Sequence, residues 1–403
     1  MKDCFYGFPR PDGSYGIRNH VLILPASRNC NYMAHRINSV VDGTKAVITL
    51  GEYGRTTSDR QRLFRFLTGL GCNPNVGAVL VLGDAHDDGH AEFDAGFMAQ
   101  KIQNETQKPV VHLYVDDAGG LECSIGKGIG HARTLVQQVS RIFRENAPLG
   151  KLQVGVKCGA SDYTSGIAGN KLIGYIFDRI VNAGGKAVFS ETVEVIGAEH
   201  ILAKRAVSRN VAEKLLEYVR KTESEIQRTG EDVRRINPIP ENITGGITTL
   251  EEKSLGAIVK SGTAPLSGVL DYCERPHSPG LYFMHGWMHS YSLMPSLAAA
   301  GCQIVFYQLG VQEGRCKDPV NHTVDPALIS PMLYTTANPL TADNMQFNLD
   351  FDASALLSGK LTLEDIGEKL LTKTISVASG ELSAGETLNY NDPLDVFFDG
   401  PFL

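Results

Sequence analysis

The feature that most constrains this 403-residue chain is a repeated order of short apolar strand, glycine-rich polar turn and helix. The clearest example is the strand Gln153 to Val156, which runs into Lys157 and Cys158 and then into a helix predicted from about Ile167 to Asn182. Backbone N–H groups converge on an anion at such a strand-to-helix turn. An ordinary βα turn with a buried cysteine is the other interpretation of these residues.

A second turn of the same kind follows the next strand. The strand at 186–190 ends at Ser190 and is followed by Glu191-Thr192-Val193-Glu194. In a parallel sheet the two turns would emerge side by side at the carboxyl ends of neighbouring strands. The pair of turns therefore favours a functional site over a structural one.

Strands and helices alternate along most of the chain, which predicts an α/β fold: two mainly parallel-sheet α/β domains with helices on both faces. The strand at 76–82 is almost purely apolar, as in a sheet buried on both faces. The segment 146–150 is the best boundary, giving an N-terminal domain 1–148 and a C-terminal domain 149–403 that carries both turns. After residue 329 the pattern indicates loops, with one more helix from Leu363 to about Leu371. The predicted strands are 20–25, 46–50, 76–82, 110–115, 153–156, 186–190, 281–284 and 303–307, and the longest predicted helices are 125–143, 167–182 and 209–228.

Charge and composition exclude several function classes. The formal net charge is −7, and Lys and Arg are scattered, whereas a nucleic-acid or membrane-surface protein would need a basic patch. No run of ~18 apolar residues predicts a membrane-spanning helix, and the first residues have no apolar signal core. The eight cysteines are spread singly, which favours reduced thiols in a cytoplasm over disulfides.

Two other segments contain residue types that bind metals. The turn 83–90 has two His and three Asp, although a solvated turn that caps the next helix is the favoured interpretation. His285 and His289 have the i,i+4 spacing of a zinc-binding helix, but Gly286 lies between them and the helix need not have begun. Neither segment is therefore a preferred metal site.

Five ordered motifs resemble the altronate and galactarate dehydratase family, and the resemblance covers nearly the whole chain. That family also contains the large subunit of (2R)-sulfolactate sulfo-lyase. The motifs lie at 7–19 (Gly-Phe-x-Arg-Pro-Asp-Gly-x-x-Gly-x-Arg-Asn), 157–166 (Lys-Cys-Gly-x-Ser-Asp-x-x-Ser-Gly), 191–199 (Glu-Thr-x-Glu-x-x-Gly-Ala-Glu), 237–256 and 262–265.

The resemblance implies a lyase that eliminates a β-substituent, water or bisulfite, from a small 2-hydroxy carboxylate to give a 2-keto acid. It also implies a divalent metal, with Fe2+ expected and Zn2+ or Mn2+ as alternatives, to hold the carboxylate and stabilise an enediolate. The general base is not identified. The implied roles are catalytic for Lys157, Ser161, Asp162 and Lys253, substrate-binding for Arg18, Asn19, Arg55, Asn242 and Thr248, and metal-ligating for Cys30, Cys158 and Glu191.

The chain departs from the family pattern at three turns. Gly51 to Arg55 replaces a turn with His and Cys, Gly83 to His86 replaces Gly-Cys-Glu, and Met284-His285 replaces Met-Asp. Arg55 would suit a second anionic group on the substrate, such as a sulfonate or carboxylate. Two alternatives therefore stay open: a (2R)-sulfolactate sulfo-lyase large subunit, and a non-catalytic ligand-binding paralogue.

The first motif begins at Gly7, whereas many members of the family carry a small SAF-type domain before it or as a separate subunit. We therefore expect a separate small SAF-type subunit, and a homo-oligomer or hetero-oligomer that binds a small anionic hydroxy acid.

Overall fold

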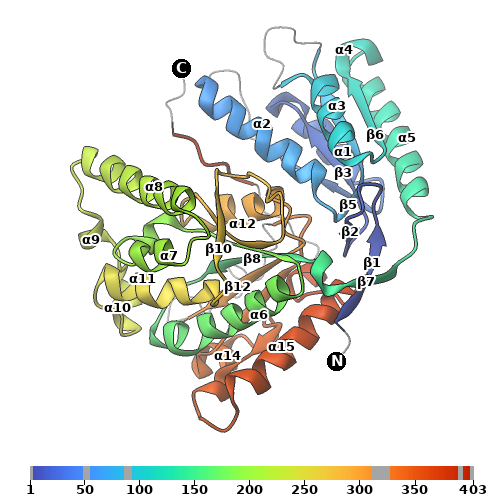
Figure 1. Cartoon of the computed structure of the whole chain (residues 1–403). Helices are drawn as coiled ribbons and strands as arrows, with labels where there is room; N and C mark the ends of the chain where they lie inside the picture. The colour runs from blue at the N-terminus through green and yellow to red at the C-terminus, as the bar shows by residue number, and fades with distance from the viewer. Residues whose placement is uncertain (1–2, 49–54, 86–92, 311–326, 389–393, 400–403) are drawn as a thin grey trace.

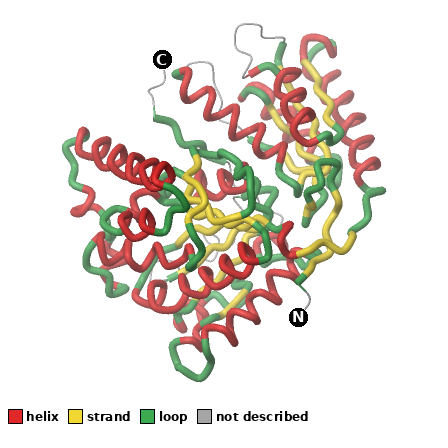
Figure 2. Tube along the Cα trace, in the orientation of Figure 1, coloured by secondary structure: helices red, strands yellow, loops and turns green. Residues whose placement is uncertain are grey.

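The computed structural model describes residues 3–48, 55–85, 93–310, 327–388 and 394–399. Two parallel sheets with helices on both faces form the molecule, as the alternating pattern predicted, and the fold class is confirmed (Figure 1). The tube view places the strands of the two sheets in two separate groups, each surrounded by helices (Figure 2).

The N-terminal sheet has four parallel strands in the order β4-β3-β5-β6. Side chains alternate between its faces: Val21 and Ile23 of β3 pack toward α1 and α5, and Leu22 and Leu24 pack toward α2 and α3. The elements are β4 (Thr44–Ala46), β3 (His20–Pro25), β5 (Val76–Gly83), β6 (Val110–Tyr114), α1 (Asn31–Asn38), α2 (Thr57–Cys72), α3 (Ala95–Thr106), α4 (Val115–Ala118) and α5 (Leu121–Val139).

The C-terminal sheet has seven parallel strands in the order β10-β11-β9-β8-β12-β13-β14. The chain leaves β8 for β9 on one side and later returns to β12 on the other, so the strand order reverses beside β8. Ligands bind at such a reversal, outside the carboxyl ends of the strands. The strands are β10 (Leu266–Leu270), β11 (Gly280–Met284), β9 (Lys186–Phe189), β8 (Gln153–Cys158), β12 (Ile304–Leu309), β13 (Met332–Thr336) and β14 (Phe351–Asp352).

Helices cover both faces of this sheet. On one face, α6 and α15 pack against apolar residues that include Val156 and Phe189, and on the other α12 packs against Val188 and Val305. The predicted helix 209–228 is confirmed, because α8 has these bounds. The helices are α6 (Asn170–Asn182), α7 (Glu199–Lys204), α8 (Arg209–Arg228), α9 (Val233–Ile236), α10 (Pro240–Thr244), α11 (Leu250–Ile258), α12 (Ser290–Ala299), α14 (Pro339–Asn344) and α15 (Leu363–Ala378).

One continuous apolar core joins the two sheets through α2 and α12. Gly69 of α2 lies so close to α12 that a Cβ there would be 2.5 Å from the carbonyl oxygen of Ala299. Only glycine permits this approach. The two sheets are therefore joined through the close contact of these two helices.

The start of the chain forms a small antiparallel sheet in the order β2-β1-β7. Its strands are β1 (Cys4–Pro9), β2 (Tyr15–Gly16) and β7 (Glu145–Pro148). Pairing with β1 therefore places the segment around the predicted boundary in a strand, and the division at 148/149 itself stays a prediction.

The prediction of loops after residue 329 was wrong for β13 and α14, whereas the predicted helix from Leu363 is confirmed by α15, which continues to Ala378. β13 is fully buried between β12 and β14. Its two threonines are satisfied within the sheet region: Thr335 Oγ1 donates to Gln308 Oε1 at 2.8 Å, and Thr336 Oγ1 donates to the carbonyl of Leu309 at 3.0 Å. Side-chain hydrogen bonding thus allows polar residues in a strand whose burial the sequence did not indicate.

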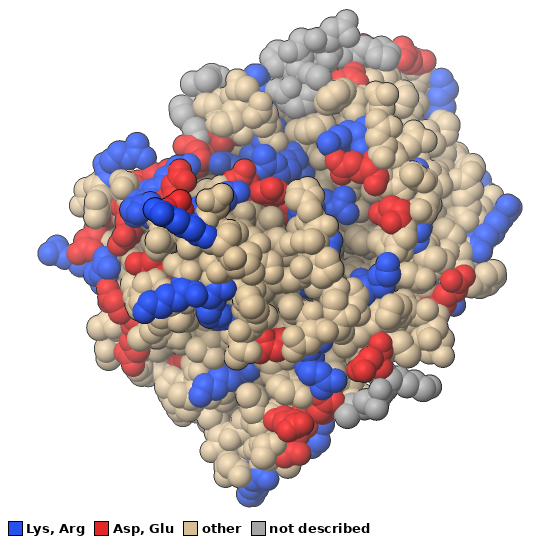
Figure 3. Space-filling model, viewed as in Figure 1, with Lys and Arg blue, Asp and Glu red and all other residues tan. Residues whose placement is uncertain are grey.

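The surface agrees with the charge pattern. On the face shown in Figure 3, Lys and Arg are interspersed with Asp and Glu, without a uniformly basic area. Among the described residues, none of the helices combines the length and apolar character that crossing a bilayer requires.

Candidate active site

Six buried side chains meet beside β8 and β9 at the carboxyl end of the seven-stranded sheet. Lys157 and Cys158 end β8, and Glu191 and Glu194 follow β9. Lys253 lies in α11 and Lys260 in the 3-10 turn Val259–Ser261 that continues it. We call these six residues the Lys–Glu centre; each is 8% exposed or less.

Lys260 lies in the middle of the centre. Its Nζ donates to Cys158 Sγ at 3.1 Å and to Glu194 Oε2 at 3.3 Å, and it also donates to Glu191 Oε2. An ammonium has three N–H donors, so each can have one acceptor here.

Glu191 is held in an uncommon conformation. Its φ is 77°, in the left-handed region that a non-glycine residue seldom adopts. Its Oε2 accepts from the backbone N–H of Cys158 at 3.2 Å, whereas Oε1 has no hydrogen-bond partner among the described residues. The Nζ of Lys157 lies 3.8 Å from Oε1. Backbone strain together with an unsatisfied carboxylate oxygen is typical of a functional position.

Lys253 is held by two amides and a carboxylate. Its Nζ donates to Asn237 Oδ1 and Asn242 Oδ1, both at 2.9 Å, and lies 3.4 Å from Glu194 Oε1. Asn242 in turn donates from Nδ2 to the carbonyl of Ser161 at 2.8 Å. This network connects α10 and α11 to the turn after β8.

Burial and neighbouring charges shift the pKa values of the two carboxyl groups in opposite directions. Burial, together with the charge of Glu194, raises the pKa of Glu191 above its usual value. Burial would also raise the pKa of Glu194, but Lys260 and Lys253 lower it to about 2. Two carboxyl groups whose environments separate their pKa values are characteristic of acid–base sites.

Lys157 and Lys260 stay charged. Burial alone would lower the pKa of Lys260, but Cys158, Glu191 and Glu194 raise it well above its usual value. Burial would lower the pKa of Lys157 too, but Tyr307 and Glu191 raise it above its usual value. Burial raises the pKa of the Cys158 thiol to about 12, so it stays protonated. Three ammonium groups then face two carboxyl groups, and the centre has an excess of positive charge.

Asp162 and Ser161 shape the turn next to the centre. Asp162 Oδ1 accepts from Thr164 Oγ1 at 2.7 Å and from the N–H of Ser165 at 2.9 Å, and its Oδ2 accepts from Asn338 Nδ2 at 2.7 Å. Ser161 is buried, and its Oγ donates to the carbonyl of Gly159 at 3.4 Å. Both carboxylate oxygens of Asp162 are therefore engaged by the protein itself.

The structure brings Lys157, Cys158, Glu191, Lys253 and Asn242 together, but it places several other predicted site residues elsewhere. Arg18 is bound by Glu386, 2.6 Å from its Nε, and by backbone carbonyls. Asn19 accepts from Arg10 and donates to the carbonyl of Val139. Thr248 is exposed, where its N–H and hydroxyl bind Glu252 at the start of α11.

Cys30 lies at the carboxyl end of the other sheet. Its Sγ is 3.1 Å from Asp84 Oδ1, and Asp84 Oδ2 accepts from Ser27 and Asn29. Burial, reinforced by Asp84, raises the pKa of the Cys30 thiol far above its usual range. Residues 86–92, which include both His and two of the three Asp of the possible metal turn, lie outside the described residues.

Arg55 stacks on Phe398, with its guanidinium carbon 4.2 Å from the ring centroid. The residue before it in the tail, Phe397, contacts His285 edge-on, with ring centroids 6.2 Å apart. His285 Nδ1 is 2.9 Å from the Oγ1 of Thr192, beside Glu191 in the chain. Arg55 therefore connects to the centre through the C-terminal tail.

The two histidines considered as a zinc pair do not share a helix. α12 begins at Ser290, so His289 only precedes it and His285 lies in the segment before. Burial lowers the pKa of His285 to about 4, and its ring stacks on Tyr218 with centroids 4.3 Å apart. His285 is thus a neutral, packed histidine.

Sequence reasoning missed Glu194 and Lys260 as site residues, although spacing could have indicated both. Glu191 and Glu194 are three residues apart across a 3-10 turn, where i and i+3 lie above each other. Lys253 and Lys260 are seven apart, two turns along one helical face.

The only candidate metal group in the described part of the chain is Cys158, Glu191 and Glu194, whose ligand atoms lie within 4.8 Å of one another. Thiolate and carboxylates are suitable ligands for iron or zinc. The Nζ of Lys260, however, already contacts all three. The three side chains could hold a metal ion, although the identity of such a metal is not shown, and the ion would have to displace the Lys260 ammonium from this position.

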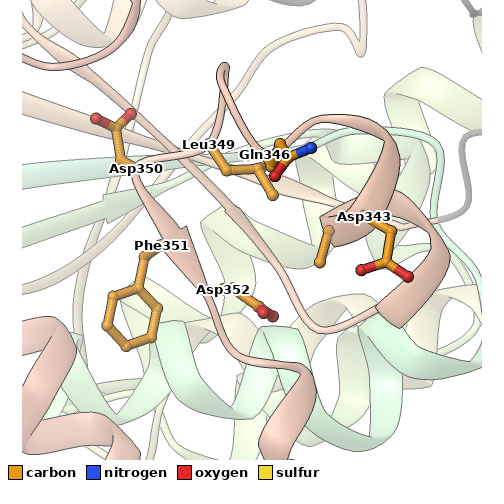
Figure 4. A pocket seen from close by; sticks show the side chains of 7 residues that line it. Asp343, Gln346, Leu349, Asp350, Phe351 and Asp352 are labelled. Atoms are coloured by element: carbon orange, nitrogen blue, oxygen red, sulfur yellow. The ribbon is translucent and has the colours of Figure 1, made fainter.

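A separate cavity of about 540 Å3 lies between α14 and β14. In Figure 4 the Asp350 carboxylate points away from those of Asp343 and Asp352, and it accepts from the N–H groups of Tyr334 and Ala384, both at 2.9 Å. This cavity shares no residue with the Lys–Glu centre.

The fold and site together define a parallel α/β protein with a buried cluster of three lysines, two glutamates and a cysteine at the strand-order reversal. Residues 149–396 match the family described as D-galactarate/Altronate dehydratase, C-terminal, and residues 7–140 match D-galactarate dehydratase/Altronate hydrolase, second domain. The chain therefore belongs to the D-galactarate/altronate dehydratase family, and the predicted membership is confirmed.

Three proteins with known names are similar to this chain over most of its length. The chain is 34% identical to the (2R)-sulfolactate sulfo-lyase subunit beta of Chromohalobacter salexigens, over 96% of each chain. It is 28% identical to the altronate dehydratases of Bacillus subtilis and Escherichia coli, over 99% and 98% of this chain but 78% of each relative. All three names are those of lyases.

Proposed function

We propose that this chain is the large subunit of a lyase that removes bisulfite from a small 2-hydroxy carboxylate bearing a sulfonate, with removal of water as the second candidate. The excess positive charge of the buried Lys–Glu centre carries the proposal, because a carboxylate substrate would balance it. Similarity to the sulfo-lyase subunit over nearly the full length of both chains favours bisulfite as the leaving group.

The elimination requires a base, a stabilised enediolate and a leaving group. In the proposed reaction Glu191 takes the proton from C2, and the electrons of that C–H bond form an enediolate with the substrate carboxylate. The leaving group then departs from C3 with its bonding pair, and the resulting enol becomes a 2-keto acid.

Lys157 and Lys253 are the groups we assign to the enediolate, since fixed charges in a buried site stabilise developing negative charge. Asn242 and Asn237 hold Lys253 in place, and Asp162 and Ser161 maintain the turn. No step is assigned to the expected Fe2+, because Lys260 contacts the donors that would bind it.

The relative's name, subunit beta, supports a separate partner subunit. The purified chain is expected to release little bisulfite from (2R)-sulfolactate alone, and at least ~10-fold more when a small partner subunit is co-expressed. Bisulfite and 2-keto acid would be measured with sulfolactate, altronate and galactarate in parallel. Full activity of the chain alone would contradict the need for a partner subunit. If no mixture eliminated water or bisulfite from any of the three substrates, the chain would be assigned as the non-catalytic ligand-binding paralogue.

Replacing Arg55 with Ala tests whether the substrate has two anionic groups. A planar guanidinium matches a second oxyanion, so Arg55→Ala is expected to lower kcat/KM for the dianionic substrate by ~10-fold or more, equal to ~1.4 kcal/mol. The matched control is Arg36→Ala on the exposed side of α1, which should leave kcat/KM unchanged. An unchanged Arg55→Ala enzyme, or preference for altronate, would assign Arg55 to packing with Phe398.

A further inference from the structure

The three acceptors around Lys260 are the same side chains that form the candidate metal group. Lys260 Nζ contacts Cys158 Sγ and Glu194 Oε2 at 3.1 and 3.3 Å, and it also donates to Glu191. Ammonium and metal ion would need the same lone pairs, so the two cannot occupy the group together. Only one cation can be the resident one.

Burial favours Lys260 as that cation. Its side chain is 2% exposed, and those of Glu191 and Glu194 are 0% and 3% exposed. Removing the ammonium would leave two carboxyl groups facing each other without their shared counter-charge. A metal would also require the Cys158 proton to leave, since the thiolate is the metal-binding form.

We propose that the Lys260 ammonium is the built-in cation of the Cys158, Glu191 and Glu194 group, where it takes the place of a divalent metal. It acts as a positioning residue: by binding Glu191 Oε2 it holds the carboxylate so that Oε1 is left for the substrate. The positioning part rests on the proposed function of Glu191, but occupation of the group does not.

The test uses Co2+ as the probe, because cobalt bound to a thiolate gives a strong near-ultraviolet charge-transfer band. The wild-type chain is expected to show no such band. The Cys158→Ser variant should bind as much cobalt as the wild-type chain does. Lys260→Met keeps the length of the side chain but removes the charge and its donors, and it should gain about one Co2+ per chain with the thiolate band. The double variant Lys260→Met/Cys158→Ser should lose the band.

Two controls keep the result interpretable. Lys253→Met removes a neighbouring ammonium that contacts Glu194, Asn237 and Asn242 and leaves Lys260 in place, so it should not create the band. Thermal melting would establish that each variant is folded. The wild-type and Cys158→Ser arms do not depend on the folding of any Lys260 variant.

A thiolate–cobalt band in the wild-type chain that Cys158→Ser abolishes would overturn the proposal, as would a folded Lys260→Met variant that binds no cobalt. All arms are measured without substrate. A failure of the proposed lyase activity therefore leaves this test unchanged, and a failure here leaves the assay of elimination unchanged.

Discussion

Glu191→Gln is expected to lower kcat/KM by about 10^3-fold while the protein remains folded. Glutamine has nearly the same size, and its amide can still occupy the place beside Lys260, but it cannot accept a proton from carbon at neutral pH. General bases contribute roughly 10^2 to 10^4 in rate, and a 10^3-fold loss corresponds to ~4 kcal/mol. Steady-state kinetics of 2-keto acid formation with the partner subunit present would measure it.

The same assignment predicts a pH dependence. A base must be ionised, and burial raises the pKa of Glu191. Activity is therefore present above that raised pKa and lost as the pH falls through it, so the acid limb of kcat/KM should lie above the ordinary glutamate value of about 4.3. In Glu191→Gln the residual activity should lack this limb.

Glu199→Gln is the matched control. Glu199 lies in the same motif at the start of α7, where its Oε2 accepts from the N–H of Gly197 at 2.6 Å, and an amide oxygen can accept this bond too. Its kinetics should equal those of the wild type. If Glu191→Gln retained more than a tenth of wild-type kcat/KM, Glu191 would not be the base.

Three of the six residues of the Lys–Glu centre could be predicted from the sequence because of parallel-sheet geometry. Polar turns after β8 and β9 had to emerge together, and this alone placed Lys157, Cys158 and Glu191 correctly beside one another. Lys260 was missed because nothing local distinguishes a lysine at a helix end from a solvated one. Only the packing of the 3-10 turn Val259–Ser261 against α6 and β9 shows that it is buried.

Arg18 shows the opposite limitation. A motif arginine can bind an anion or the protein's own backbone, and the choice depends on residues that are far away in the sequence. Here Glu386 and three carbonyl groups bind it, the carbonyls of Val377 and Glu381 lying more than 350 positions along the chain. Such long-range partners have no signal in local spacing.

The fold was predictable where strands were apolar and uninterrupted. β5, with eight buried residues in succession, was recognisable from hydrophobicity alone. β13 was not, because its threonines are satisfied by Gln308 and Leu309 of β12, which are 27 positions away. Tertiary hydrogen bonds therefore allow β13 to be buried, although its local sequence pattern did not indicate a strand.

Asn75→Ala is expected to destabilise the whole chain by about 3 to 5 kcal/mol. Asn75 is fully buried, and its side chain makes three hydrogen bonds between segments that are distant in sequence. Its Oδ1 accepts from the N–H of Ile17 at 2.9 Å, and its Nδ2 donates to the carbonyls of Gln303 and Ile329 at 2.9 and 3.0 Å. Alanine would leave one buried donor and two acceptors unpaired, at roughly 1 to 3 kcal/mol each, partly relieved by relaxation.

Because these bonds tie the start of the N-terminal sheet to the strands β12 and β13, the loss should appear in one shared transition. Denaturant unfolding followed by both far-ultraviolet and fluorescence signals would measure it. Asn75→Asp should destabilise the chain at least as much, since a buried carboxylate can accept from Ile17 but faces the two carbonyl oxygens without a donor. Asn104→Ala, on the exposed side of α3, should change stability by less than ~0.5 kcal/mol. A similarly small change for Asn75→Ala would mean that the two sheets are held together by the apolar contact of α2 with α12 alone.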